Sequence, residues 1–251
     1  FPQEYSIGSK SAPVHVDYNN DGENELIYLD SYGNLRIIDL LGNIILEENS
    51  EVQENIYSSY AVTNINETPT IVYTSRTNNL VAQEIGGEVL FRYDSGSQFI
   101  TSPMIADING DGENEIIALN IAKEVIVLNF EGELLPNFPV ELDIYSVYEM
   151  AVADLNGDNK ADIVIATNNN QLQAIDYQGQ YLPSYPLTLP SNNITAPLIT
   201  SDRIVVASLN TLYSLDYEGN IVHQFEVSGA PVMPIANDFN NDGYVDYGFV
   251  T

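Results

Sequence analysis

One nine-residue pattern occurs four times in this chain and constrains its fold more than any other feature. In the copy at residues 107–115, oxygen-bearing side chains stand at positions 1, 3, 5 and 9, and glycine stands at position 6. Ca²⁺ takes about six to eight oxygen ligands from a loop curled around it, and glycine permits the sharp turn because it lacks a Cβ. The aliphatic run 116–119 follows at once. The pattern therefore predicts a calcium-binding loop that opens a β-strand.

The closing residue distinguishes this loop from an EF-hand. An EF-hand keeps its closing carboxylate for the last position of a loop of about 12 residues, and the loop lies between helices. Here the closing acid is Glu115, at position 9, and the backbone carbonyl of Glu113, at position 7, is expected to point inward. The sequence therefore predicts a calcium loop of a different kind.

The other three copies, residues 17–25, 154–162 and 238–246, also precede apolar runs. The copy at 154–162 has Asn159 where the others have glycine, and asparagine is the next residue most tolerant of the left-handed backbone conformation. A single nonapeptide of this kind would fit a solvated acidic turn. Four copies, each placed before a strand, favour metal binding.

A second repeat gives the spacing of the structural unit. Segments of five residues that start at 35, 80, 125, 172 and 212 are each followed by a glycine and a further apolar stretch. This order predicts a β-hairpin with glycine in its turn. Each unit of roughly 45 residues reads as four strands, and no segment of useful length has helical periodicity. Such units are typical of β-propeller blades.

We therefore expect an all-β chain that forms a single β-propeller domain over residues 1–251. Blades that carry the calcium loop start near residues 12, 101, 148 and 231, and degenerate blades without metal start near 60 and 195. Six blades are favoured and seven are possible. Phe1–Pro2 matches segments that open a last strand, and 246–251 matches a second strand, so five blades are complete and the first and last are partial. We expect the sequence to be a section of a longer polypeptide.

The charge and the cysteine content exclude several classes of function. The chain has 36 acidic and 7 basic residues, a net charge of −29, which disfavours nucleic acid and anionic membrane surfaces as partners. Four Ca²⁺ would add +8 and leave −21, so the remaining excess is interpreted as a solubility surface. The absence of cysteine excludes disulfides and thiolate sites, and no apolar run is long enough for membrane insertion.

The Asp-x-Asn-x-Asp-Gly-x-x-Glu/Asp loop before an apolar strand, repeated at blade spacing, resembles the FG-GAP (VCBS-type) repeat of integrin-α-like β-propellers. The resemblance covers nearly the whole chain, strongly in four units and in degenerate form in two. It implies that each loop joins the first and second strands of a blade and binds Ca²⁺, which gives four sites. The glutamates at position 9 depart from the commoner aspartate of the family.

Carried over position by position, the resemblance implies sixteen side-chain ligands and four backbone carbonyls. The side chains are those of Asp17, Asn19, Asp21, Glu25, Asp107, Asn109, Asp111, Glu115, Asp154, Asn156, Asp158, Asp162, Asp238, Asn240, Asp242 and Asp246. The carbonyls belong to Glu23, Glu113, Lys160 and Tyr244. We expect the metal to be structural, because the crowded carboxylates repel one another until a cation joins them.

The resemblance also implies a non-catalytic module for adhesion or for binding a protein or glycan, outside the cell or on its surface. The absence of cysteine favours a bacterial origin over a small secreted animal domain. Partners would meet the face opposite the calcium loops, near 49–60, 94–101, 143–148 and 191–195, with short loops at 31–34 and 76–79. Other domains of the longer polypeptide would be further partners. The aromatic residues in or beside these connections are Tyr32, Tyr57, Tyr60, Phe99, Tyr145 and Tyr148. Tyrosine is enriched at protein interfaces, but it is also enriched in β-strands, so these residues fit either role.

Two alternatives stay open, a calcium-dependent polysaccharide lyase or other carbohydrate-active propeller, and a rigid spacer in a large surface protein. His15 and His223 fall in strands of different units, and nothing places serine and aspartate beside either, so no catalytic residue is predicted. Paired carboxylates could cleave glycosides, but most acids are assigned to the loops. The chain has no tryptophan, which disfavours the quinone cofactor of related propellers.

Overall fold

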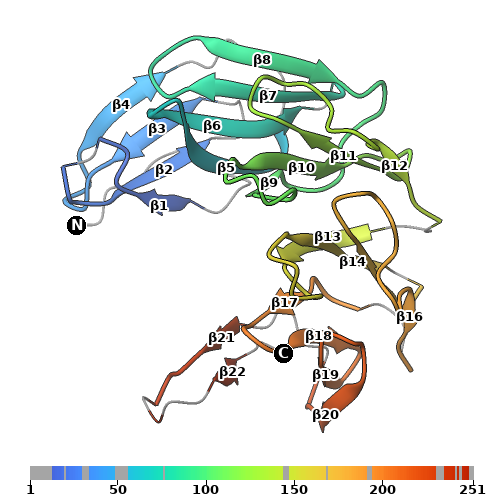
Figure 1. The fold of residues 1–251 in the computed structure, drawn as a ribbon. Helices are drawn as coiled ribbons and strands as arrows, with labels where there is room; N and C mark the ends of the chain where they lie inside the picture. Colours follow the sequence, from blue (N-terminus) through green and yellow to red (C-terminus); the bar gives the residue numbers. More distant parts are fainter. Residues whose placement is uncertain are drawn as a thin grey trace. The chain divides into compact units, whose positions relative to one another are not determined.

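A computed structural model describes residues 13–19, 21–29, 34–48, 56–75, 77–143, 147–167, 169–190, 194–229, 235–240, 242 and 245–248. For 56–59 and 147–149 the description is limited to the backbone. Every regular element in these ranges is a β-strand, which confirms the predicted all-β class. The strands form five four-stranded sheets and one two-stranded sheet, each in chain order (Figure 1). The number of blades in the whole propeller stays a prediction.

The first three sheets each hold four consecutive strands. The first sheet holds β1 (Val14–Val16), β2 (Glu25–Leu29), β3 (Leu35–Ile38) and β4 (Ile44–Glu48). The second holds β5 (Ile56–Ile65), β6 (Thr68–Ser75), β7 (Asn79–Glu84) and β8 (Val89–Asp94). The third holds β9 (Met104–Ala106), β10 (Glu115–Leu119), β11 (Glu124–Leu128) and β12 (Val140–Glu141).

The remaining sheets follow the same order. The fourth sheet holds β13 (Val147–Ala153), β14 (Asp162–Thr167), β15 (Gln171–Ile175) and β16 (Leu187–Thr188). The fifth holds β17 (Leu198–Ile199), β18 (Ile204–Ser208), β19 (Thr211–Leu215) and β20 (Ile221–Glu226). The sixth, within the described residues, holds β21 (Ile235–Asn237) and β22 (Asp246–Gly248).

A short turn built on an acidic or amide side chain connects the third and fourth strands of a sheet. In the first sheet, Asp39 accepts hydrogen bonds at its Oδ1 from the backbone N–H groups of Leu41 (2.9 Å) and Asn43 (2.7 Å). The backbone N–H of Gly42 donates to the Asp39 carbonyl, and the φ of Gly42 is 89°. The same turn starts at Asn129, Asp176 and Asp216. Side-chain acceptors at the start of a turn satisfy its backbone donors, which explains why these residues recur.

Neighbouring sheets pack through the third strand of the following sheet. Leu35 and Ile37 of β3 share a buried cluster with Tyr73 and Val81 of the second sheet. Leu80 of β7 shares one with residues 126 and 128 of β11, and Leu172 of β15 shares one with residues 213 and 215 of β19. Sheets with two apolar faces need a neighbour on each side, and this packing supplies it.

By contacts the chain divides into two compact units, Phe1–Ile105 with Ile116–Leu135 and Ala106–Glu115 with Pro136–Thr251. The clusters that join sheets one to three lie in the former, and those that join sheets four to six lie in the latter. Among the described residues no helix is long and apolar enough to cross a membrane.

The turn glycines that face the preceding sheet are also sterically required. A Cβ on Gly179 would lie 2.4 Å from Cγ2 of Val140, and the φ of Gly179 is 74°. Gly96 has a similar φ of 69°, but nothing lies within 4 Å of its Cβ position. The two glycines therefore separate the cost of the backbone conformation from the cost of the close contact.

We predict that Gly179→Ala lowers the free energy of unfolding by about 2–4 kcal/mol, because it adds overpacking to the backbone cost. Gly96→Ala should pay only the backbone cost of about 1–2 kcal/mol. Urea denaturation of both variants checks the difference. Equal losses would contradict the contact between Gly179 and Val140.

Candidate metal sites

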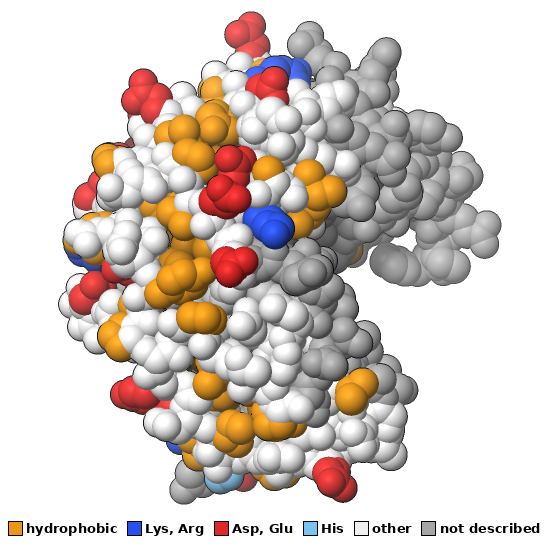
Figure 2. All heavy atoms as spheres, turned by 90° about the vertical axis from the view of Figure 1, so that its right-hand side faces the viewer, with side chains coloured by type: hydrophobic (Ala, Val, Ile, Leu, Met, Phe, Trp, Pro, Cys, Tyr) orange, Lys and Arg blue, Asp and Glu red, His pale blue; other side chains and the backbone are white. Residues whose placement is uncertain are grey.

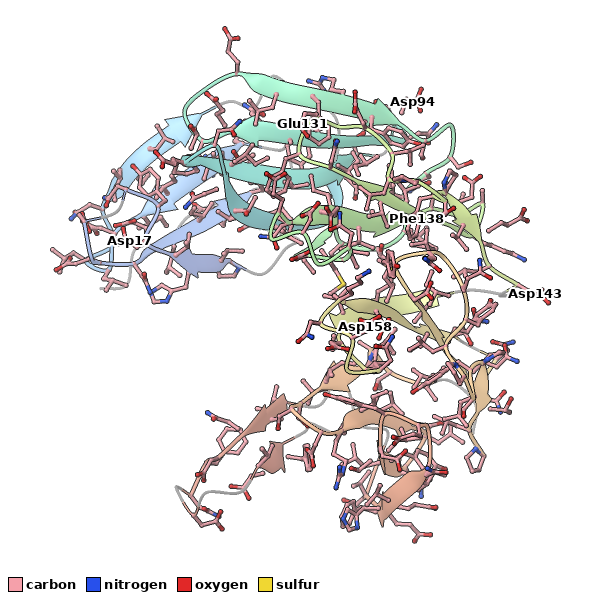
Figure 3. The ribbon with its side chains drawn as sticks, in the orientation of Figure 1. Asp17, Asp94, Glu131, Phe138, Asp143 and Asp158 are labelled. Carbon is pink, nitrogen blue, oxygen red and sulfur yellow. The ribbon has the colours of Figure 1, made fainter. Side chains whose placement is uncertain are left out.

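All four predicted loops connect the first strand of a sheet to the second. They lie between β1 and β2, β9 and β10, β13 and β14, and β21 and β22. Asp17 and Asp158 mark two of them in Figure 3. The degenerate second sheet has in this place a two-residue turn, Asn66–Glu67, in which both residues have positive φ. Tyr244 lies outside the described residues.

The first-position aspartate turns inward onto the backbone of its loop. In the loop at 107–115, Asp107 accepts hydrogen bonds from the backbone N–H groups of Gly110 (2.6 Å) and Gly112 (2.9 Å). Asn109 Oδ1 accepts from the N–H of Asp111 (2.8 Å), and Asp111 Oδ1 accepts from that of Glu113 (2.8 Å). The oxygen-bearing side chains at positions 1, 3 and 5 thus fold around one short stretch of backbone.

The other loops repeat these hydrogen bonds. Asp17 accepts from the N–H groups of residues 21 and 22, and Asp154 accepts from those of residues 157, 158 and 159. Asp238 accepts from the N–H of Asp242 (3.0 Å). The third-position asparagines of these loops each accept from the residue two positions later. The four loops therefore share one local conformation wherever they are described.

In three loops the ninth-position carboxylate is the most buried of the oxygen-bearing side chains. Glu25, Glu115 and Asp162 have exposed fractions of 3%, 3% and 1%. One oxygen of each accepts from the backbone N–H of the second loop residue, at 3.3, 2.9 and 2.9 Å, and Asp246 accepts in the same way at 3.1 Å. This bond ties the closing acid to the start of its own loop.

The residue after the fifth-position aspartate has a left-handed backbone. The φ values of Gly22, Gly112 and Asn159 are 92°, 91° and 63°. No atom lies within 4 Å of a Cβ built on Gly22 or Gly112. Glycine is therefore favoured there by the positive φ and not by a lack of room for a side chain. Asparagine at the equivalent place is explained by its tolerance of this region.

Burial, together with the neighbouring acids, raises the pKa of the closing carboxylates Asp162 and Glu115. Burial raises the pKa of Asp162 to about 6, and the charges of Asp158 and Asp154 act in the same direction. Burial likewise raises the pKa of Glu115, with Asp111 and Asp107 contributing. A buried carboxylate among like charges is unstable in its ionised form, and a cation in contact with the group reverses this effect.

The donor set fits a hard cation. Each loop offers carboxylate and amide oxygens together with a backbone carbonyl, and such oxygens are the ligands of Ca²⁺. Among the described residues no three acidic or histidine side chains converge closely enough to hold an ion by themselves. A shell of mixed donors includes amide and carbonyl oxygens, so it does not require three converging acids.

Two of the loops contact each other. The backbone N–H of Ala161 donates to the carbonyl of Asp107 at 3.3 Å. Cγ of Lys160 lies 3.0 Å from the position of a Cβ on Gly110. The Lys160 ammonium lies 3.5 Å from the centroid of the Tyr177 ring. The sequence had assigned only the backbone carbonyl of Lys160 to the loop, and no sequence signal indicated this role of its side chain.

The aromatic residues expected beside the partner face divide into two groups. Tyr60 and Phe99 are buried, with exposed fractions of 5% and 0%, and the Tyr60 hydroxyl donates to the carbonyl of Ile27. They are core residues and do not offer a surface to a partner. The side chains of Tyr32, Tyr57, Tyr145 and Tyr148 lie outside the described part of the chain.

Comparison with known proteins supports the fold. The family model of the FG-GAP repeat matches residues 146–180, which contain the loop at 154–162. No curated protein matches the chain. The structure of BBS1N in complex with ARL6DN is similar with a TM-score of 0.70 and 12% identity, over 92% of this chain and 70% of that chain.

Two bacterial proteins have the same similarity of fold. BamB from Moraxella catarrhalis gives a TM-score of 0.64 at 13% identity, over 94% of this chain and 66% of its own. The V. cholerae biofilm matrix protein Bap1 gives 0.66 at 17% identity, over 92% of this chain and 42% of its own. At such identities the likeness concerns the fold alone. The chain is a β-propeller that contains an FG-GAP repeat.

We predict that Lys160→Ala lowers the free energy of unfolding by about 1 kcal/mol, because it removes the cation–π contact and the stem against Gly110. Lys160→Met keeps the stem, so it should lose only the cation–π part. A double-mutant cycle with Tyr177→Leu, measured by urea denaturation, isolates that part. Strictly additive effects of Lys160→Met and Tyr177→Leu would contradict the interaction.

Proposed function

We propose that this β-propeller is a calcium-stabilised binding module of a bacterial extracellular or surface protein, which engages a protein or glycan partner and performs no catalysis. The observation that carries the calcium part is the buried ninth-position acid. Asp162 is 1% exposed, and its pKa is raised to about 6 by burial and by neighbouring carboxylates. A bound divalent cation would supply the positive charge that this arrangement lacks.

The loops are placed where a cation would act on stability. Each loop joins two neighbouring strands of one sheet. A cation that holds the two ends of the loop together would therefore help to keep these strands paired. At a free calcium concentration 100 times the Kd, one site adds about 2.7 kcal/mol to the free energy of unfolding. Four such sites would be comparable to the roughly 5–15 kcal/mol that stabilises an ordinary domain. The proposed role is therefore structural.

The binding part rests on the fold and on exposed turns. The similar BBS1N was solved in complex with ARL6DN, and the similar Bap1 is a biofilm matrix protein. In this chain, Ile121 occupies the turn between β10 and β11, at the end of β10 away from the loop at 107–115, with an exposed fraction of 64%. Exposed aliphatic side chains at turn tips fit contact with a partner.

The surface charge bears on the kind of partner. Figure 2 shows acidic side chains dispersed over the face in view, among hydrophobic and uncharged ones. The net charge of −29 repels polyanions and other acidic surfaces. We propose a neutral glycan or a protein that is not strongly acidic.

For calcium, we predict that Asp162→Asn changes stability in opposite directions with and without the metal. In EGTA the variant should melt at a higher temperature than the unmodified protein, because it removes a buried negative charge. In saturating calcium it should lose about 2.7 kcal/mol, the contribution of one site at 100 times the Kd. Glu131→Gln makes the same change of net charge on an exposed turn and serves as the control. A melting temperature that is the same in EGTA and in calcium would contradict the proposal.

A pH dependence in EGTA follows from the same group. The pKa of Asp162 is raised in the folded state from 3.8 to about 6, so the folded protein binds more protons than the unfolded one between these values. The stability of the unmodified protein relative to Asp162→Asn should therefore fall as the pH rises through this window. Urea denaturation at several pH values in EGTA measures it. A relative stability that is constant with pH would contradict the raised pKa.

For the partner, we predict that Ile121→Asp weakens binding at least about tenfold, because it places a charge in an apolar contact. Leu41→Asp is the matched control, since Leu41 is 78% exposed on a turn between a third and a fourth strand. A glycan array and a panel of immobilised matrix proteins provide the probes. Binding that survives Ile121→Asp would contradict the role of this turn, and release of oligosaccharides from a polysaccharide would contradict a non-catalytic role.

A further inference from the structure

The third-position asparagine is followed by glycine in two of the four loops. These loops contain the pairs Asn109–Gly110 and Asn156–Gly157, whereas Asn19 and Asn240 each precede another asparagine. An asparagine before glycine loses its side-chain amide more readily than one before other residues. The reason is that glycine has no side chain to hinder attack on the amide by the next backbone nitrogen. The chain therefore contains two candidate sites of deamidation and two matched positions that lack the glycine.

The reaction takes place within one such pair. The backbone nitrogen of Gly157 bonds to Cγ of Asn156, the bond between Cγ and Nδ2 breaks, and the amide leaves as ammonia with the proton of the Gly157 N–H. Water then opens the cyclic imide at either of its carbonyl carbons, which gives aspartate or isoaspartate at position 156. Water is the only co-reactant.

In the loop at 107–115, several contacts oppose this reaction. The amide nitrogen of Asn109 donates hydrogen bonds to the carboxylates of Asp111 (2.9 Å) and Glu115 (3.1 Å). The stem of Lys160 covers the glycine, with its Cγ 3.0 Å from a Cβ built on Gly110. Loss of the amide nitrogen as ammonia must break both hydrogen bonds, and the backbone of the pair has little room to move. Asn109 is therefore protected by its surroundings.

The pair in the loop at 154–162 lacks these contacts. The Asn156 side chain is exposed, and within the described part of the chain its amide nitrogen donates no hydrogen bond. Apart from its chain neighbours, no atom lies within 4 Å of a Cβ built on Gly157. The closing acid of this loop is Asp162, whose side chain is one methylene group shorter than that of Glu115. The two pairs thus share a sequence but differ in their protection.

The constraint that holds Asn156 is the conformation of its own loop. Oδ1 of Asn156 accepts from the backbone N–H of Asp158 (2.9 Å), and the N–H of Gly157 donates to Asp154 (2.7 Å). Both bonds are lost when the loop opens. Repulsion among the carboxylates favours opening, and a cation that binds these oxygens opposes it.

We propose that Asn156 is a site of spontaneous deamidation, and that its rate depends on whether its loop holds a cation. The preference for Asn156 over Asn109 follows from the contacts above, whereas protection by calcium rests on the proposed function. Isoaspartate at position 156 adds a backbone carbon between Asp154 and Asp158, so the loop no longer closes around a cation. A period without calcium therefore leaves a permanent change in this loop.

Ageing of the protein of residues 1–251 in EGTA and in saturating calcium tests the proposal. Mass spectrometry of its peptides over time follows the conversion of each amide to an acid, and labelling by protein isoaspartyl methyltransferase identifies isoaspartate. In EGTA the reaction at Asn156 should be several-fold faster than at Asn109. It should be slower still at Asn19 and Asn240. Calcium should slow the reaction at Asn156 several-fold.

Substitutions test the two causes separately. Lys160→Ala removes the stem that covers Gly110, so it should speed the reaction at Asn109, and Lys160→Met keeps the stem and is the matched control. Asn156→Gln keeps an amide but would have to close a larger ring, so it should react far more slowly. After ageing in EGTA and return to calcium, this variant should keep its melting temperature, whereas the protein without substitutions should melt at a lower temperature than before ageing.

Equal rates at Asn156 and Asn109 in EGTA, or a rate at Asn19 as high as at Asn156, would overturn the proposal. Equal rates at Asn156 in EGTA and in calcium would also overturn it if calcium raises the melting temperature. Equal rates together with equal melting temperatures would overturn the proposed calcium binding as well, which separates the two failures.

Discussion

A four-stranded sheet with two apolar faces cannot stand alone in water, and the structure depends on this constraint. All five residues of β10 and all six of β14 are buried, so these strands are covered on both faces. The third strand serves two neighbours at once. In β19, Leu212 joins a cluster with Tyr247 of the following sheet, while Tyr213 and Leu215 join the cluster of the preceding sheet. Because successive side chains of a strand point to opposite faces of its sheet, one strand can pack against both neighbouring sheets.

The candidate metal loops differ from the sheets, because they bring charged side chains together instead of apolar ones. A first-position aspartate stabilises its turn by accepting backbone N–H groups, as Asp107 does at 2.6 and 2.9 Å. The same geometry brings Asp111 and Glu115 close to it, and the pKa of Glu115 rises with its burial. The backbone N–H groups of the turn therefore have hydrogen-bond acceptors, but its carboxylates repel one another. A loop of this kind is stable only to the extent that protons or cations compensate its carboxylates.

The sequence predicted most of the fold, because the periodicity of strands and turns is local. The five segments that start at 35, 80, 125, 172 and 212 were expected to enter β-hairpins, and they overlap β3, β7, β11, β15 and β19, the third strands of five sheets. The left-handed backbone expected at Asn159 is present, with a φ of 63°. The candidate ligands were assigned from the same kind of local pattern, since each set lies within nine residues, and their binding of a metal stays a prediction.

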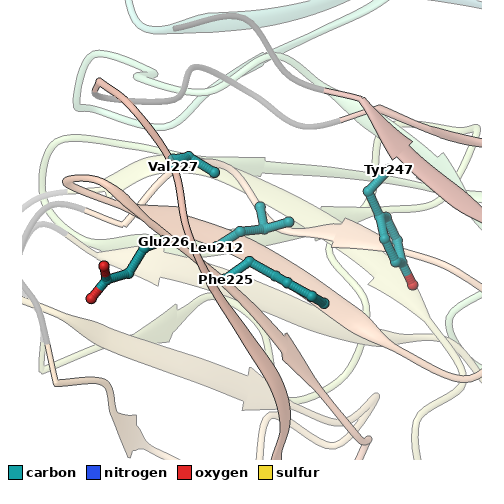
Figure 4. A pocket seen from close by; sticks show the side chains of 5 residues that line it. All are labelled: Leu212, Phe225, Glu226, Val227 and Tyr247. Atoms are coloured by element: carbon teal, nitrogen blue, oxygen red, sulfur yellow. The ribbon is translucent and has the colours of Figure 1, made fainter.

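Contacts between distant segments could not be predicted in this way. Lys160 lies over the ring of Tyr177, which belongs to a different turn of the fourth sheet. A pocket at Phe225 is lined by residues of the fifth sheet and by Tyr247 of β22 (Figure 4). Phe99 was expected beside a partner surface, yet it is buried in the cluster between the second and third sheets. Its sequence position in a connection says nothing of its burial, because burial there is set by the neighbouring sheet.

An acidic surface and exposed apolar residues are compatible because they act over different ranges. Exposed apolar residues such as Phe225 and Ile221 would promote association of copies on contact. The net charge of −29 opposes the approach of two copies over a distance of about one Debye length, roughly 8 Å at physiological salt, before apolar groups can touch. A neutral or basic molecule meets no such barrier. The charge therefore opposes self-association through exposed apolar residues without opposing the approach of a neutral or basic molecule.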